Sequence, residues 1–224
     1  MAIGKCMAGV GQIYRAGSIA DPPESNIGDR EYGLWNTEFV KQFGYFSAPS
    51  PAEQVLNEDS ANGGQSWADA LDSCSAQPPV ELRDLIPSNE ETTKSLVARI
   101  RTEAYNAASS DPAWQSAREL WWGCLRKAGL DPRTGAGEWN TRQAYDLLMT
   151  VGGQGQPANS EELIRVAYAE AKCNDETGMA QTLGNLEAAY QPPLIDRNQA
   201  ALNSEKQRKQ DRLATARKYV AANG

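Results

Sequence analysis

A repeated segment that carries one cysteine in each copy constrains this chain more than any other feature. Residues 5–11 read Lys-Cys-Met-Ala-Gly-Val-Gly, and residues 123–129 read Gly-Cys-Leu-Arg-Lys-Ala-Gly. The cysteines of the two copies are 118 positions apart, and so are their final glycines. One further cysteine follows each copy along the chain. The sequence therefore predicts two related halves, each with its own pair of cysteines.

The four cysteines predict two disulfide bonds. Of the three possible pairings, the repeat favours the one that keeps each bond inside one half, namely Cys6–Cys74 and Cys124–Cys173. Each bond closes a long loop, for which the chain-entropy model gives roughly 4 kcal/mol. There is no CxxC motif and no histidine, so neither a zinc site nor a redox pair is indicated. Disulfides predict an exported protein; four free thiols in a cytosolic protein are the alternative.

Hydrophobic periodicity is helical along the chain, which predicts an all-α fold. The long C-terminal helix expected over 194–222 has no apolar stripe in its middle, which predicts a solvated arm lying on the body; a partner-binding coiled coil is the alternative. We expect one domain over 1–224, and the alternative is two separable lobes, 1–109 and 110–224. The chain is long enough to bury a substantial core in either case.

Local signals place several helix ends and loops. Residues 47–65 are rich in proline and glycine and predict a loop, with one helical turn over 53–56 as the alternative, and Ser66 is expected to cap the helix that follows. Residues 151–157 predict a flexible linker. The expected signals are Asn36 as cap and Gly44 as end of a short helix, a Ser88–Glu91 capping box for a helix to about residue 108, Asp111-Pro112 and Ser160 as further starts, and Pro78-Pro79 as a stop.

Charge and hydropathy exclude some partners. The net charge of −7 argues against nucleic acids and anionic membranes as the main partners. No run approaches the length of about eighteen apolar residues that a membrane span needs. The N-terminus does not read as a signal peptide, so Met1 is interpreted as a start placed on a mature fragment, from which a precursor's lipid anchor would be missing.

The chain resembles a family of secreted, often lipid-anchored helical proteins of actinobacteria whose function is uncharacterised. The matching elements are the two cysteine segments, Tyr32-Gly33-Leu34, Phe43-Gly44-Tyr45, the tryptophan-rich helix with Cys124 and Gly129, and 169–173. Leu125 stands where this family usually has methionine. The resemblance implies an extracellular, cell-surface location and partners such as envelope transporter components or a cell-wall polymer. It assigns no catalytic residue.

Enzyme chemistry has little support in this composition. Without histidine, a serine–histidine triad and a cysteine–histidine pair are both excluded. Asp131 and Glu138, beside Trp139, are the candidate acids of a glycosidase, although loop acids at the surface are the favoured interpretation. The acidic stretch 57–64 does not match the spacing of a calcium loop, and a polar loop is favoured there. No metal, cofactor or catalytic residue is predicted.

Aromatic side chains are the candidate binding residues. The chain has six tryptophans, two of them adjacent in one helix. The candidates for a sugar- or peptide-stacking cleft are Trp35, Tyr45, Trp122 and Trp139, with ordinary core packing as the favoured alternative. Trp122 and Trp139 are expected to face each other across the glycine-rich turn 135–137. The predicted function is a non-enzymatic envelope protein that binds or acts as a structural accessory; the alternatives are a carboxylate-dependent hydrolase of wall glycan and a small-ligand-binding protein.

Overall fold

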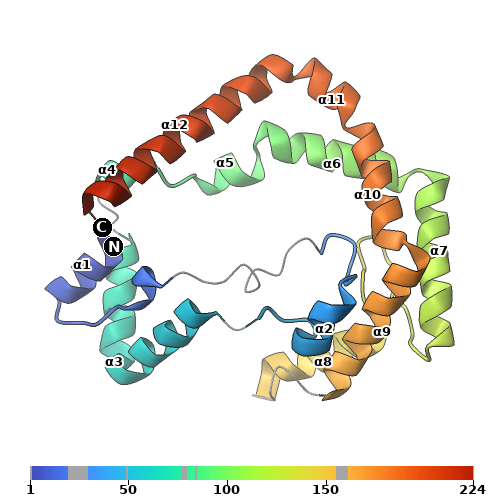
Figure 1. Ribbon diagram of the computed structural model, residues 1–224, viewed down its shortest axis with the longest axis horizontal. Helices are drawn as coiled ribbons and strands as arrows, with labels where there is room; N and C mark the ends of the chain where they lie inside the picture. The colour runs from blue at the N-terminus through green and yellow to red at the C-terminus, as the bar shows by residue number, and fades with distance from the viewer. Residues whose placement is uncertain are drawn as a thin grey trace. The chain divides into compact units, whose positions relative to one another are not determined.

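The protein is built from helices whose limits are set by capping side chains and glycines. The computed structural model describes residues 2–19, 30–48, 50–76, 80–83, 85–154 and 161–223, and these residues form an all-α fold without a β-strand (Figure 1). None of the helices in these ranges is both long enough and apolar enough to span a bilayer. The helical elements are α1 (Ala2–Gly9), η1 (Ala16–Ser18), α2 (Thr37–Phe43), α3 (Pro51–Ala76), α4 (Val80–Arg83), α5 (Asn89–Thr93), α6 (Leu96–Ser109), α7 (Pro112–Lys127), α8 (Arg142–Gln154), α9 (Glu161–Thr177), α10 (Met179–Tyr190), α11 (Pro192–Arg197) and α12 (Gln199–Asn223).

Three predicted start signals are confirmed. The Asn36 side chain accepts a hydrogen bond from the backbone N–H of Phe39 at 3.0 Å and so caps α2. Ser88 and Glu91 form a capping box at the start of α5. Each side chain accepts the backbone N–H of the other residue, and both hydrogen bonds are 3.0 Å long. Asp111 caps α7 at 2.8 Å, and the proline after it needs no N–H partner in the first turn. Local hydrogen bonding is sufficient to set these ends.

The helix that follows the capping box is shorter than expected. It ends at Thr93 instead of continuing to about residue 108. Ser95 starts a new helix, α6, because its hydroxyl accepts the N–H of Ala98 at 3.1 Å. A second capping serine therefore divides one predicted helix into two.

The loop expected over 47–65 is also wrong for most of its length, because α3 runs from Pro51 through both glycines. Gly64 has non-helical angles (φ 58°, ψ −148°), so α3 consists of two helical stretches that meet at a kink there. A Cβ on Gly63 would lie 2.5 Å from the Cβ of Trp67, so glycine allows the indole to pack there. The polar stretch 57–64, where a loop was favoured, is accordingly helical up to Gly63. The predicted linker is wrong over 151–154, which belong to α8. Its residues 155–157 lie outside the described residues, as do Pro78-Pro79 and Ser160.

The chain divides into two compact units, and each has one of the predicted disulfides. Unit 1 comprises Met1–Ser25, Pro49–Arg99 and Arg197–Gly224, and unit 2 comprises Asn26–Ala48 and Ile100–Asp196. The units differ from the halves of the repeat, because the chain enters unit 2 before α2 and returns to unit 1 with α12. Two intact disulfides are typical of proteins that fold in an oxidising compartment.

Unit 1 is held together around the first disulfide. Cys6 in α1 is bonded to Cys74 in α3, beside the buried side chains of Met7 and Trp67. The Trp67 indole N–H donates to the carbonyl of residue 13 at 2.6 Å. The buried carboxylate of Asp59 accepts the backbone N–H and the Nε of Arg15, both at 2.7 Å, and so attaches the chain after α1 to α3.

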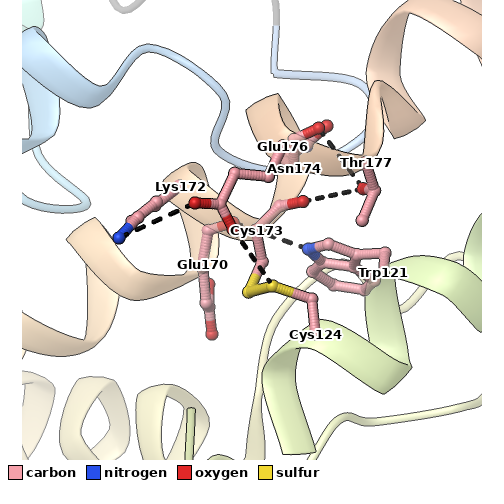
Figure 2. Close-up of a disulfide and its surroundings, with 8 residues drawn as sticks. All are labelled: Trp121, Cys124, Glu170, Lys172, Cys173, Asn174, Glu176 and Thr177. Atoms are coloured by element: carbon pink, nitrogen blue, oxygen red, sulfur yellow. Dashed lines mark hydrogen bonds and ion pairs between the residues drawn. A yellow bond between two sulfur atoms is a disulfide. The ribbon is translucent and has the colours of Figure 1, made fainter. Parts of the chain in front are cut away.

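Unit 2 contains the larger core, in which α7 packs against α9 and α10, and α9 also contacts α2 and α8. The second disulfide joins Cys124 in α7 to Cys173 in α9 (Figure 2). Beside it, the Trp121 indole N–H points to the backbone carbonyl of Glu170 at 3.5 Å. The disulfide therefore reinforces a helix pair that already shares buried aromatic and aliphatic side chains.

Candidate functional site

The segment 30–35, which leads into α2, contributes side chains to two hollows of unit 2. We call them the Trp35 hollow, of about 470 Å³, and the Trp139 hollow, of about 390 Å³. The Trp35 hollow is lined by Glu31, Tyr32, Trp35, Asn174, Asp175, Gly178, Ala180, Gln181 and Gly184. The Trp139 hollow is lined by Arg30, Gly33, Leu34, Tyr45, Arg133, Gly137, Glu138, Trp139 and Asn140.

Gly33 fixes this segment against the loop before α8. Its φ of +81° lies in the left-handed region that favours glycine. A Cβ at this position would lie 2.8 Å from the carbonyl oxygen of Trp139. The neighbouring Tyr32 ring meets the Trp139 ring edge to face at 5.7 Å. The Tyr-Gly-Leu segment therefore has a structural reason for its central glycine.

The Trp35 hollow combines an accessible aromatic ring with carboxylates. Trp35 is 50% exposed. The carboxylate of Glu31 accepts a hydrogen bond from Arg101 at 2.7 Å, and Asp175 lines the same hollow from the last turn of α9. Behind it, the buried Asn174 side chain donates to the Tyr32 carbonyl at 3.0 Å and so holds the segment against α9. The Trp35 hollow thus has a half-exposed indole and the carboxylates of Glu31 and Asp175, and the Asn174–Tyr32 hydrogen bond holds its base together.

The Trp139 hollow is bordered by polar groups that bond to one another. Arg30 donates to the carbonyl of Tyr45 at 2.7 Å. Arg133 donates to Asn140 at 2.9 Å and forms an ion pair with Glu138, whose carboxylate also accepts the Gly135 N–H at 2.7 Å. These contacts order the wall of the hollow.

Trp122 and Trp139 contact a common side chain, Arg118. Its guanidinium carbon lies 4.6 Å from the centroid of the Trp122 ring and 5.0 Å from that of Trp139. The same guanidinium donates to the Gly135 carbonyl at 2.7 Å. Trp122 is only 7% exposed and belongs to the core of unit 2. An arginine, not a ligand, therefore stacks on both rings. Core packing, the favoured interpretation, holds for Trp122, which lines neither hollow.

The four candidate residues are therefore distributed over three environments. Trp35 lines one hollow, Tyr45 and Trp139 line the other, and Trp122 is in the core. The structure brings together only Tyr45 and Trp139 at one surface.

A buried carboxyl that the sequence did not single out lies behind Tyr45. Glu170 in α9 is fully buried. It accepts hydrogen bonds from the Tyr45 hydroxyl and from the Thr141 N–H, the latter at 2.6 Å. Burial raises the pKa of Glu170 to about 7, although both hydrogen bonds oppose the shift. Burial, with Glu170 beside it, also raises the pKa of Tyr45.

A sequence signal for Glu170 existed. It occupies a place in the apolar stripe of α9, four residues after Val166 and three before Cys173, where an acidic side chain is out of pattern. Glu31 and Asp175 carried no such signal, because only the fold places segment 30–35 beside the end of α9.

The acids proposed from sequence have arginine partners. Asp131 lies 3.6 Å from Arg142, and Glu138 pairs with Arg133 as described. Of these two acids, Glu138 lines the Trp139 hollow and Asp131 lines neither hollow. In the described ranges, no group of three or more histidine, cysteine, aspartate or glutamate side chains is arranged to hold a metal ion.

Comparison with known proteins adds no relative. No protein-family model, no curated protein and no solved structure matches this chain.

Proposed function

We propose that the protein is a non-enzymatic, extracytoplasmic component of the cell envelope that binds a sugar unit of a cell-wall polymer in the Trp35 hollow. The observation that carries this proposal is the half-exposed indole of Trp35 on a wall that also holds the carboxylates of Glu31 and Asp175. An indole face covers the apolar face of a sugar ring, and carboxylates accept hydrogen bonds from its hydroxyls.

The envelope location rests on two further supports. Disulfides Cys6–Cys74 and Cys124–Cys173 favour an oxidising compartment. The resemblance to secreted, lipid-anchored proteins favours the cell surface. A wall polymer is preferred over an envelope transporter component as the partner, because the hollow is of small-ligand size.

A glycan and peptide binding screen tests the proposal. We expect wall-type glycans to bind, and Trp35→Ala to weaken their dissociation constant by about fivefold to a hundredfold, by analogy with aromatic–base stacking. Leu120→Ala is the matched control, because Leu120 is an exposed side chain of unit 2 that lines neither hollow. Unchanged affinity in Trp35→Ala, or binding of peptides alone, would contradict the proposal.

A carboxylate-dependent hydrolase is the second candidate, and the observation that favours it is the presence of Glu31 and Asp175 in one hollow. Glycosidases use two carboxyl groups on either side of the scissile bond. Release of reducing ends from wall glycan by the wild type, lost in both Glu31→Gln and Asp175→Asn, would establish this reaction. Binding without release would favour the non-enzymatic function.

A further inference from the structure

Helix α12 is a basic element in an acidic protein. It contains six lysine and arginine residues and two acidic residues, a net charge of +4, whereas the whole chain has −7. Such segregation concentrates positive potential along one helix. Positive charge is therefore concentrated on α12, although the whole chain is negative.

An apolar groove of about 470 Å³ follows this helix within unit 1. Its other wall is the segment from Leu85 to Ser95, which includes α5. The apolar lining consists of Leu85, Pro87, Leu213 and Ala216. Leu213 also lines a second hollow of about 390 Å³ with Val97 and Leu202, and it is 50% exposed. The two hollows together form the α12 groove.

Cationic side chains edge the groove, and Arg208 is the one that has no direct ion pair within the described part of the chain, although its charge also acts on the nearby Glu91. Arg212 donates to Glu91 at 2.9 Å, and Lys209 lies 3.0 Å from Glu205. Among the described residues, Arg208 forms no ion pair. The lining of the larger hollow therefore has one positive charge in excess over its two carboxylates.

We propose that the α12 groove binds a single-chain amphiphile with an anionic head, such as a long-chain carboxylate, with the head at Arg208 and the chain against Leu213. Charge complementarity selects an anion, and the apolar lining selects a hydrocarbon chain. The volume lies in the range of small-molecule sites, which favours one amphiphile over a macromolecule. This site lies in unit 1 and is independent of the function proposed for the Trp35 hollow.

Calorimetric titration of the full chain with monomeric dodecanoate tests the proposal. Arg208→Glu is expected to weaken binding at least about tenfold, because it removes a charge-assisted contact and repels the carboxylate. Leu213→Asp is expected to abolish binding. The matched controls on the same helix are Lys218→Glu and Val220→Asp, which change exposed side chains outside both hollows and are expected to bind as the wild type does.

Three further probes separate the parts of the ligand. Acetate has the head alone, dodecyl maltoside has the same chain with a neutral head, and anionic phospholipid vesicles offer a charged surface. We expect none of them to displace dodecanoate. Displacement by the maltoside, binding of vesicles in place of dodecanoate, or equal weakening by Arg208→Glu and Lys218→Glu would each overturn the proposal. If Arg208→Glu fails to fold, the neutral variant Arg208→Gln takes its place in the test, and it must weaken dodecanoate binding for the proposal to stand.

Discussion

At the scale of single residues, Glu170 gives unit 2 an unusual dependence on pH. Its folded pKa of about 7 lies above the ordinary value of 4.5, so folding favours the protonated carboxyl. The stabilisation is complete below about pH 4.5 and is lost as the pH rises through about 7. A shift of this size corresponds to ~3 kcal/mol. Carboxylates held in ion pairs respond in the opposite direction, so the effect must be measured as a difference between variants.

Glu170→Gln provides that difference. Glutamine imitates the protonated carboxyl, so we expect the variant to match the wild type near pH 5 and to exceed its free energy of unfolding by ~3 kcal/mol near pH 8. Urea unfolding at both pH values measures this, and Glu119→Gln, on the exposed side of α7, is the control. A difference that does not change with pH would mean that Glu170 does not titrate in this range.

Truncation of two tryptophans should lower the free energy of unfolding by very different amounts. Trp122 lies in the core with its ring beside Arg118, so Trp122→Ala should cost about 3–5 kcal/mol of unfolding free energy. Trp35 is half exposed, so Trp35→Ala should cost much less, on the order of 0.5 kcal/mol, while affecting ligand binding. Thermal melts of the two variants measure this difference. A stability loss in Trp35→Ala as large as that in Trp122→Ala would argue against the role of Trp35 as an accessible stacking face.

At the scale of helices, the cap of α7 also connects two elements. Asp111 accepts the first-turn N–H at 2.8 Å, and its second oxygen accepts the Tyr190 hydroxyl of α10 at 3.1 Å. Asp111→Ala should therefore cost about 1–2 kcal/mol in urea unfolding, at or above the usual value for a cap. Asp111→Asn retains a capping oxygen and should cost less. Equal losses in the two variants would show that charge, and not capping, is what the position supplies.

Helix starts were predictable because they depend on neighbours in sequence, as Asn36 and Asp111 show. The course of α3 was not, because it depends on Trp67 packing over Gly63. Core packing was the favoured interpretation of Trp122, but the helical pattern alone did not establish it. Helix α7 packs against both α9 and α10, so more than one of its faces is buried, and a single apolar stripe does not describe it.

The candidate site was predictable only in part. Aromatic residues at Trp35, Tyr45 and Trp139 were recognised from their type, and the structure places each on a hollow. Their carboxylate neighbours come from distant parts of the chain, as Glu31 and Asp175 do, and no local pattern brings them together.

At the scale of the whole molecule, the repeat was sufficient to predict both disulfides but not the division into units. Both bonds connect a repeated helix to the next cysteine, and this relation can be read from spacing. The return of α12 to unit 1 has no counterpart in the repeat, because it depends on contacts between segments that are far apart in sequence. A repeat identifies related local elements, whereas the units depend on which distant segments pack together.

Each disulfide should stabilise mainly its own unit, because each bond lies wholly within one. Replacing Cys6 and Cys74 by serine should reduce amide protection in α1 and α3, and replacing Cys124 and Cys173 should reduce it in α7 and α9. Each double variant should cost about 2–5 kcal/mol in the affected unit. Hydrogen exchange resolved by segment measures both effects, and each variant is the control for the other. Equal loss of protection in both units from either variant would instead show that the chain unfolds as one cooperative body, since a local crosslink would then act on the whole.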